Sequence, residues 1–232
     1  MGDDDKRMRR IRSFVRRPGR LTPGQQRALD DLLPRFGIDA RVTDLRDAFD
    51  RQAELVVEIG FGNGQALAWM AEREPGRNFV GIEVHEPGVG RLLLAVAERE
   101  LDNVRVCMRD AMEVLDAQTQ QASVDELRVY FPDPWPKKRH HKRRLVQGPF
   151  LDRAARVLAP GGLLHLATDW QPYAEWMREH LSAHAAFHIE DADAPRPAWR
   201  PETHFERRGL KRGHAISDLL VRRNEVPARS ST

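Results

Sequence analysis

The segment Leu55-Val56-Val57-Glu58-Ile59-Gly60-Phe61-Gly62-Asn63-Gly64 decides the fold of this 232-residue chain. Its first five residues are apolar except for one acid, which predicts a buried strand. Three alternating glycines follow, and residues 65–74 have the apolar spacing of an amphipathic helix. Glycines between a strand and a helix let the backbone approach a ligand closely. The segment therefore predicts a strand–turn–helix unit with a ligand at the carboxyl end of the strand.

Strand and helix patterns alternate along the rest of the chain. We expect further strands at residues 79–84, 104–108, 127–131, 163–167, 187–190 and 215–221. We expect helices at residues 22–33, 88–100, 146–158, in a short stretch after Asp110 and in a stretch after Trp170. Pro34 and Gly37 are expected to end the first helix, and Ala159-Pro160-Gly161-Gly162 to separate a helix from the next strand. This alternation predicts a single doubly wound α/β domain with a parallel sheet.

The composition predicts a soluble protein of a reducing compartment. Hydrophobic residues make up 41% of the chain, charged residues 31%, and no apolar run approaches the ~20 residues of a membrane helix. The N-terminus lacks the apolar segment of a secretory signal, and Cys107 is the single cysteine. We therefore expect a cytoplasmic location and a buried, unreactive Cys107. Asp3-Asp4-Asp5-Lys6 resembles part of a tag-cleavage sequence, which leaves open whether residues 1–6 are native.

Positive charge is concentrated in three segments. The formal net charge is only +3, but residues 6–20, 137–144 and 207–212 are each rich in Lys and Arg. Most charge runs are solvated faces. Three separate clusters, one beside a candidate active turn, instead favour a nucleic acid as partner. We expect residues 1–20 to be a basic arm, residues 21–222 to form the domain, and residues 223–232 to be a tail.

The candidate active turn is Phe131-Pro132-Asp133-Pro134-Trp135-Pro136. The first proline ends the strand before it, so Asp133 and Trp135 lie on a stiff turn at a carboxyl strand end. Open α/β sheets bind their ligands at this edge. A carboxylate next to the cationic run 137–144 predicts chemistry on a polyanion. Whether Trp135 packs in the turn or stacks on a base stays open.

Acidic residues stand at the ends of three predicted strands. Glu58 precedes the glycines, Glu83 ends the second strand and is placed to bind ribose hydroxyls, and Asp110 follows the third. The glycine spacing is Gly-x-Gly-x-Gly, which differs from the Gly-x-Gly-x-x-Gly of dinucleotide folds. The combination is typical of the S-adenosylmethionine site of class I methyltransferases. Glu58 could instead be a satisfied strand-end residue, and Asp110 a helix cap.

On these motifs the chain resembles the bacterial tRNA (guanine-N7)-methyltransferases over about residues 11–222. The matching segments are Glu58–Gly62, Gly81–His85, Phe131–Trp135, Thr168–Trp170, Thr203–Gly209, and, before the sheet, Ile11–Arg17 and Leu21–Gln26. The proline turn and the Thr203–Glu206 segment are far more specific than the glycine turn. Pro136 departs from the family pattern, a minor difference.

The resemblance implies a Rossmann-like class I methyltransferase fold, with a seven-stranded, mostly parallel sheet whose last strand is antiparallel. It implies methyl transfer from S-adenosylmethionine to N7 of a variable-loop guanine of tRNA, guanine 46. Asp133 is the implied catalytic residue. The implied cofactor-binding residues are Glu58, Gly60, Gly62, Gly64, Glu83, Asp110 and Asp133. The implied substrate-binding residues are Lys137, Asp169, Thr203, His204, Phe205 and Glu206.

The basic segments should contact RNA phosphates and recognise shape more than sequence. The expected phosphate contacts are Lys138, Arg139, Lys142, Arg143, Arg144, Arg207 and Arg208. Thr203-His204-Phe205-Glu206 also fits a helix-capping box, but Gly209 and Gly213 favour a substrate-facing loop. His180, His184 and His188 recur every four residues without a metal-site motif, so we expect no metal.

Three other functions stay open at this stage. They are a small-molecule class I methyltransferase, a non-catalytic RNA-binding module on the same fold, and, more remotely, a dinucleotide-dependent oxidoreductase. Acids at all three cofactor positions argue against a non-catalytic module. The fold admits a monomer and a dimer, and we favour a monomer with tRNA as partner.

Overall fold

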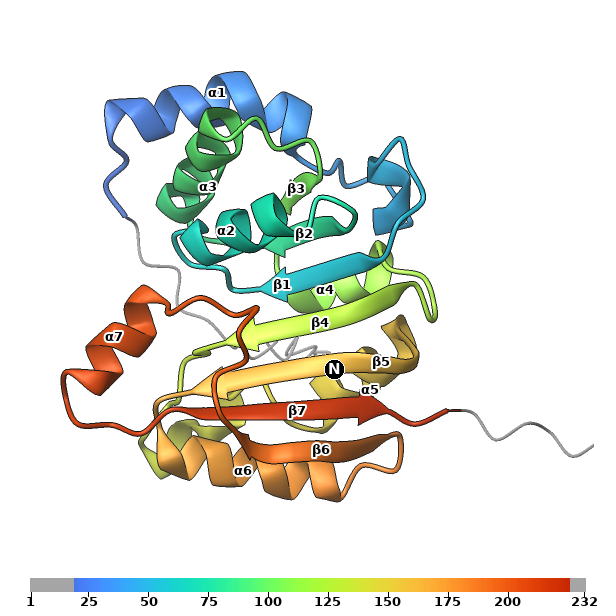
Figure 1. Cartoon of the computed structure of the whole chain (residues 1–232), viewed down its shortest axis with the longest axis vertical. Helices are drawn as coiled ribbons and strands as arrows, with labels where there is room; N and C mark the ends of the chain where they lie inside the picture. The colour runs from blue at the N-terminus through green and yellow to red at the C-terminus, as the bar shows by residue number, and fades with distance from the viewer. Residues whose placement is uncertain (1–18, 226–232) are drawn as a thin grey trace, which may run out of the picture.

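The structure of the chain, a computed structural model, describes residues 19–225. Most of the predicted basic arm (residues 1–20) and tail (residues 223–232), and the family-like segment Ile11–Arg17, lie outside the described residues. Figure 1 shows the described chain as one twisted sheet with helices packed around it.

The sheet has seven strands in the order β3-β2-β1-β4-β5-β7-β6. The last strand along the chain, β7, pairs antiparallel with β5 and β6, and the pairs among β1 to β5 are parallel. This arrangement confirms the predicted doubly wound sheet with an antiparallel last strand. The strands are β1 (Leu55–Ile59), β2 (Asn78–Ile82), β3 (Val104–Cys107), β4 (Val124–Tyr130), β5 (Leu158–Thr168), β6 (Phe187–Ala194) and β7 (Ser217–Arg223).

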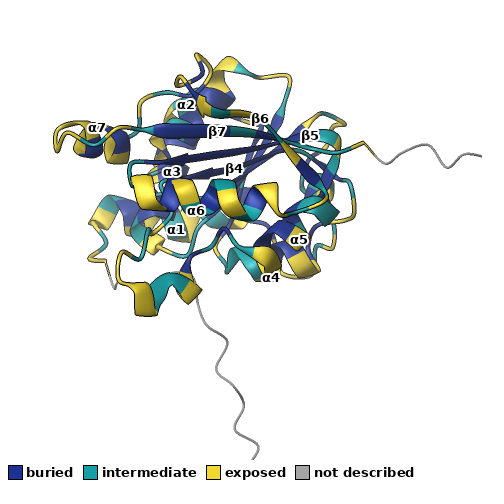
Figure 2. Ribbon diagram, turned by 90° about the horizontal axis from the view of Figure 1, so that it is seen from below, coloured by how far each residue is buried: buried dark blue, intermediate teal, exposed yellow. Residues whose placement is uncertain are grey.

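Helices cover both faces of the sheet, and Figure 2 shows the buried strands between them. They are α1 (Pro23–Phe36), α2 (Gln65–Arg73), α3 (Glu86–Glu98), α4 (Ala111–Ala117), α5 (Gly148–Val157), α6 (Gln171–Ser182) and α7 (His204–Leu210). Two short 3-10 helices are η1 (Leu45–Ala48) and η2 (Lys138–Arg143). None of the described helices is long and apolar enough to cross a bilayer.

The core consists of two apolar clusters, one on each face. Alternate side chains of a strand point to opposite faces, so Val56 packs with α1, α2 and α3, whereas Val57 packs with α4, α5 and α6. Cys107 is buried in the second cluster, and burial raises the pKa of its thiol to about 12. It is the inert core residue that the sequence predicts.

Two element boundaries differ from the sequence-based expectation. Helix α1 continues through Pro34 to Phe36, because Phe36 is buried in the core and the Gly37 N–H donates to the Leu33 carbonyl oxygen at 2.7 Å. Strand β5 begins at Leu158 and includes the segment expected to separate it from α5. The pairing of β5 with β4 shifts register there, and Gly161 supplies the left-handed conformation with a φ of 74°.

The expected loop at residues 203–206 is also wrong: this segment begins helix α7. The Thr203 hydroxyl accepts from the Glu206 N–H at 3.1 Å, which makes Thr203 the N-cap. Gly209, which the sequence predicts to break a helix, lies inside α7 against Asp169. A Cβ at Gly209 would lie 2.8 Å from that of Asp169, so the glycine serves close packing.

Gly88, at the start of α3, generates the first testable prediction. A Cβ at Gly88 would lie 2.0 Å from the Gly62 carbonyl oxygen, so Gly88→Ala must displace the helix or the glycine turn. We expect a destabilisation of ~1–3 kcal/mol in denaturant-induced unfolding. The matched control is Gly24→Ala in α1, where a Cβ meets nothing within 4 Å. That change should stabilise by ~0.5–1 kcal/mol. Equal stability of Gly88→Ala and the parent would contradict the packing.

Candidate active site

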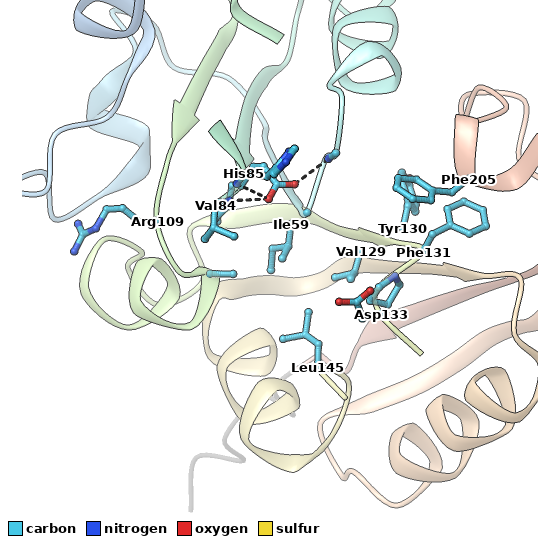
Figure 3. A pocket seen from close by; sticks show the side chains of 16 residues that line it. Ile59, Val84, His85, Arg109, Val129, Tyr130, Phe131, Asp133, Leu145 and Phe205 are labelled. Atoms are coloured by element: carbon cyan, nitrogen blue, oxygen red, sulfur yellow. Dashed lines mark hydrogen bonds between the residues drawn. The ribbon is translucent and has the colours of Figure 1, made fainter. Parts of the chain in front are cut away.

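A cavity of about 340 Å³ opens at the carboxyl ends of β1, β2 and β4. Its walls include the last residue of each of these strands, Ile59, Ile82 and Tyr130. Here the strand order reverses. Strands β2 and β3 lie on one side of β1, and β4 and the later strands lie on its other side. Such a switch point is the usual ligand site of an open α/β sheet. Figure 3 shows the side chains that line it.

The glycine turn fixes an acidic side chain in this cavity. Gly60, Gly62 and Gly64 have φ values of 72°, 61° and 70°, a region that favours glycine. The Gly62 N–H donates to Oε2 of Glu83 at 3.1 Å, and the Val84 and His85 N–H groups donate to its Oε1 at 2.7 and 3.1 Å (Figure 3). These three donors fix the carboxylate, whose remaining lone pairs can accept from ligand hydroxyls.

Glu58 lies beneath the glycine turn and lines a second cavity of about 220 Å³. It is 3% exposed, and its Oε2 has no hydrogen-bond partner among residues 19–225. Arg128 stands opposite it on β4, but Nε of Arg128 donates to Oε1 of Glu126 at 2.6 Å. Burial therefore raises the pKa of Glu58 to about 7. The alternative of a satisfied strand-end residue does not hold.

The proline turn carries Asp133 into the first cavity. Phe131 and Trp135, on either side of it, have left-handed φ values of 53° and 44°. This conformation costs a non-glycine residue ~1–2 kcal/mol, and such strain is concentrated at functional sites. The turn is held in place by Arg144, whose Nε donates to the Pro134 carbonyl oxygen at 3.0 Å.

Arg144 differs from the other predicted phosphate contacts because it is buried. It is only 2% exposed, and its guanidinium lies 4.9 Å from the ring centroids of both Tyr173 and Trp176 on α6. A side chain enclosed in this way is badly placed to contact a phosphate. Its role is to fasten the proline turn to α6.

The other predicted cations lie on the surface. Lys137, Lys138, Arg139, Lys142 and Arg143 are exposed on and beside η2, and Arg207 and Arg208 are exposed on α7. The Arg143 guanidinium lies 4.8 Å from the ring centroid of Trp135, so one contact of this indole is a cation–π pair within the loop.

Of the remaining predicted site residues, Thr203, His204 and Phe205 line a cavity, whereas Asp110 and Asp169 are not among the lining residues. Asp110 caps α4, with Oδ1 accepting from the Met112 N–H at 2.8 Å, so its capping role is confirmed and a contact to ligand stays a prediction. Asp169 follows β5 and pairs with Nδ1 of His214 at 3.3 Å. His204 and Thr203 line the second cavity, and Phe205, 49% exposed, lines both cavities.

Glu206 has its partners inside the protein. Its Oε2 accepts from Nη1 of Arg200 at 2.5 Å, and its Oε1 pairs with Arg196 at 3.4 Å. Its direct contact with substrate stays a prediction. The three recurring histidines, His180, His184 and His188, have separate partners in Trp176, Asp152 and Asn224.

Comparison with known proteins identifies the family. The model of a family described as putative methyltransferase matches residues 52–219. The tRNA (guanine-N(7)-)-methyltransferase of Halorhodospira halophila is 52% identical over 222 residues, which are 92% of this chain and 95% of that protein. The enzyme of the same name from Alkalilimnicola ehrlichii is 53% identical over 227 residues, with 94% and 95% covered.

The chain belongs to the tRNA (guanine-N(7)-)-methyltransferase family.

Solved structures agree on the fold. The antibiotic-resistance methyltransferase Kmr superposes with a TM-score of 0.54 at 17% identity, over 79% of this chain and 92% of that one. The fold of this family member is therefore that of the class I methyltransferases, as the sequence predicts.

The cavity fits the cofactor of these enzymes. Ile59, Ile82, Ala111 and Leu145 give it apolar walls, and Glu83 offers fixed acceptors for ribose hydroxyls. The unpartnered Oε2 of Glu58 is suited to a positively charged ligand group beside the glycine turn.

Sequence reasoning missed a group of buried polar residues behind the cavity. Arg128, His165, Arg200 and Asp218 are all essentially inaccessible and belong to three strands and the segment before α7. The available signals were a histidine and an aspartate beside the apolar residues of predicted strands, since both require partners when buried. Their partners are too distant along the chain to be assigned from spacing.

The pKa of Glu58 predicts how cofactor affinity depends on pH. Because burial raises this pKa from 4.5 to about 7, the carboxyl is protonated below pH 7 in the free protein. A cationic ligand that favours the ionised form should bind more tightly as pH rises from 6 to 8. The gain is at most about tenfold per pH unit below the pKa. Calorimetric titration with S-adenosylmethionine measures it, and Glu58→Gln should remove this component. An identical pH profile in Glu58→Gln would exclude the role.

Proposed function

We propose that this chain transfers the methyl group of S-adenosylmethionine to N7 of a guanine in tRNA, the variable-loop guanine 46. The observation that carries the proposal is a cavity of about 340 Å³ at the switch point, with Asp133 on one wall, where the strained proline turn leads directly into exposed cations. Membership of the family supports the same reaction.

The cofactor-binding residues follow from the cavity. Glu83 would hold the ribose hydroxyls, the segment Arg109–Ala111 borders the expected base end, and Glu58 faces the charged end below Gly60 and Gly62. Bound there, S-adenosylmethionine supplies an electrophilic methyl group on a sulfonium sulfur. The protein must then exclude water and present the guanine from the open side of the cavity.

Alignment is the main contribution of the protein to this reaction. Guanine N7 has an in-plane lone pair and is unprotonated at neutral pH, so the displacement needs neither a strong base nor a metal. A bond forms between N7 and the methyl carbon while the carbon–sulfur bond breaks, and the positive charge moves to the guanine. Holding the reacting atoms in line can contribute ~7–11 kcal/mol.

Asp133 and Asp169 are suited to hold the guanine. Asp133 follows β4 and lines the cavity, and Asp169 follows the adjacent strand β5 at the same edge of the sheet. Carboxylates accept from the N1–H and N2–H groups of guanine, and they offset the charge that methylation adds to the base. In this role Asp133 touches the reacting base, and Arg144 acts indirectly by holding the turn.

The exposed cations of η2 and α7 would bind the RNA backbone on either side of the cavity. The target base must leave its stack before N7 can reach the methyl group, at a cost of a few kcal/mol. The fold admits a monomer and a dimer, and we propose a monomer as the active unit. An enzyme acting on tRNA is expected in the cytoplasm.

The test is transfer of a labelled methyl group from S-adenosylmethionine into bulk tRNA, compared with small-molecule acceptors, followed by nucleoside analysis. We expect 7-methylguanosine in tRNA, mapped to the variable loop. Asp133→Asn should lower the rate by ~10²-fold with both ligands saturating, since misplacement of the base costs about that much. The matched control is Asp30→Asn on the exposed face of α1. Label in a small acceptor alone, or a wild-type rate in Asp133→Asn, would contradict the proposal.

The cationic surface predicts a steep salt dependence of tRNA binding. Each phosphate contact contributes roughly 0.7–0.9 to the slope of log K against log salt. Replacing Lys138 and Arg139 by Gln should flatten that slope by roughly 1–2. The control pair is Arg41→Gln and Arg222→Gln, which alters charge equally at surface positions outside the three basic segments. If the control pair flattens the slope and the η2 pair does not, the RNA binds elsewhere.

A further inference from the structure

Five buried side chains form an unbroken hydrogen-bonded chain behind the two cavities. The Tyr130 hydroxyl lies 2.9 Å from Nδ1 of His165, and Nε2 of His165 lies 2.7 Å from Oδ1 of Asp218. Arg200 donates to both oxygens of Asp218, through Nε at 2.8 Å and Nη2 at 2.6 Å. Its remaining terminal nitrogen, Nη1, donates to Glu206 at 2.5 Å. The chain therefore runs from β4 through β5 and β7 to α7.

The protonation states determine which atom donates in each of these buried hydrogen bonds. Burial lowers the pKa of His165 and raises that of Tyr130 well above its usual value, so the imidazole is neutral and the phenol keeps its proton. Asp218 can only accept, because its pKa is lowered by His165 and Arg200, which outweigh its burial. His165 must then donate from Nε2 to Asp218 and accept a hydrogen bond from the Tyr130 hydroxyl at Nδ1. Each donor thus has one acceptor, and reversing one bond would leave another unmade.

The two ends of the chain lie on different parts of the active site. Tyr130 ends β4 and lines both cavities. Glu206 lies in α7 directly after Phe205, which also lines both cavities and approaches Gly62, since a Cβ at Gly62 would lie 3.3 Å from its ring. Arg200 stands between these ends, with its guanidinium 5.5 Å from the Tyr130 ring centroid and 5.8 Å from that of Phe131.

Such a buried ionic chain is poorly explained by stability alone. Replacing buried ion pairs by apolar residues of similar volume is often neutral or stabilising, whereas their directional bonds specify one arrangement. Here they specify the place of α7, a seven-residue helix that packs on the site through Phe205 and Gly209. We therefore expect a change at Tyr130 to alter the position of α7.

We propose that Arg200, Asp218 and His165 are positioning residues that couple occupation of the cofactor cavity to the placement of α7 and so to RNA binding. This inference rests on the proposed function. The affinity for S-adenosylmethionine should then depend on whether tRNA is bound. Because coupling between two sites is reciprocal, the affinity for tRNA should depend equally on whether S-adenosylmethionine is bound.

The test compares the Kd of S-adenosylhomocysteine, by calorimetry, for the free protein and for the protein saturated with tRNA. We expect the two values to differ by roughly fivefold or more in the parent, as is typical of coupled sites. Tyr130→Phe keeps the ring on the cavity but removes the terminal hydroxyl, and the ratio of the two Kd values should fall towards one. His165→Gln, which can still donate to Asp218 but does not supply the Nδ1 acceptor, is the second variant and should act in the same direction.

The matched control is Arg196→Met. Arg196 pairs with the same Glu206 at 3.4 Å but is 40% exposed on its side chain, and it is not part of the chain to Asp218. It should keep the parental ratio. Binding of both ligands with a ratio of one in the parent, or an undiminished ratio in variants that melt like the parent, would overturn the coupling and leave the proposed function intact. Failure to bind either ligand would overturn both.

Discussion

Close approach of the backbone at Gly62 is the constraint on which the rest of the site depends. The Gly62 N–H holds the Glu83 carboxylate, its carbonyl oxygen lies against Gly88 at the start of α3, and its α-carbon faces the Phe205 ring. Strand β1, the end of β2, helix α3 and helix α7 therefore meet around one residue without a side chain. The left-handed φ of 61° favours glycine there, and a Cβ would lie 3.3 Å from the Phe205 ring, so Phe205 would have to shift.

Buried charges on this side of the sheet divide into satisfied and unsatisfied groups. Arg128 and Glu126 are paired with each other, and Arg200 is paired with Asp218 and Glu206. Glu58 is left without such a partner, although it lies opposite Arg128 in the β1–β4 register. Burying a polar group without a partner is unfavourable, so such a group needs an explanation, and a bound ligand would supply one. The ion pairs keep the framework fixed, whereas Oε2 of Glu58 and Nη2 of Arg128 have no hydrogen-bond partner among residues 19–225. In the proposed function, the charged end of the cofactor would be the partner of Glu58.

Local patterns in the sequence predicted the parts of the fold that local chemistry controls. The bounds of β1 and the start of α2 follow from apolar residues, glycines and helix periodicity. The predicted strand ends also place Glu58, Glu83 and Asp110 at the carboxyl edge of the sheet. The prediction failed where tertiary packing overrides local preference. Phe36 is buried and keeps α1 helical beyond Pro34, and Gly209 lies within α7 because Asp169 packs on it. Arg144 looked like its exposed neighbours in the basic run, and only the fold shows that α6 covers it. The chain from Tyr130 to Glu206 joins residues too far apart for any spacing rule.

A crystal structure with S-adenosylhomocysteine bound tests the central claim most directly. The account predicts the nucleoside in the cavity at the ends of β1, β2 and β4, with the ribose hydroxyls on Glu83 and the amino acid end beside Glu58. The sulfur should face the wall that carries Asp133. A nucleoside bound outside this cavity, or one whose ribose does not contact Glu83, would contradict it.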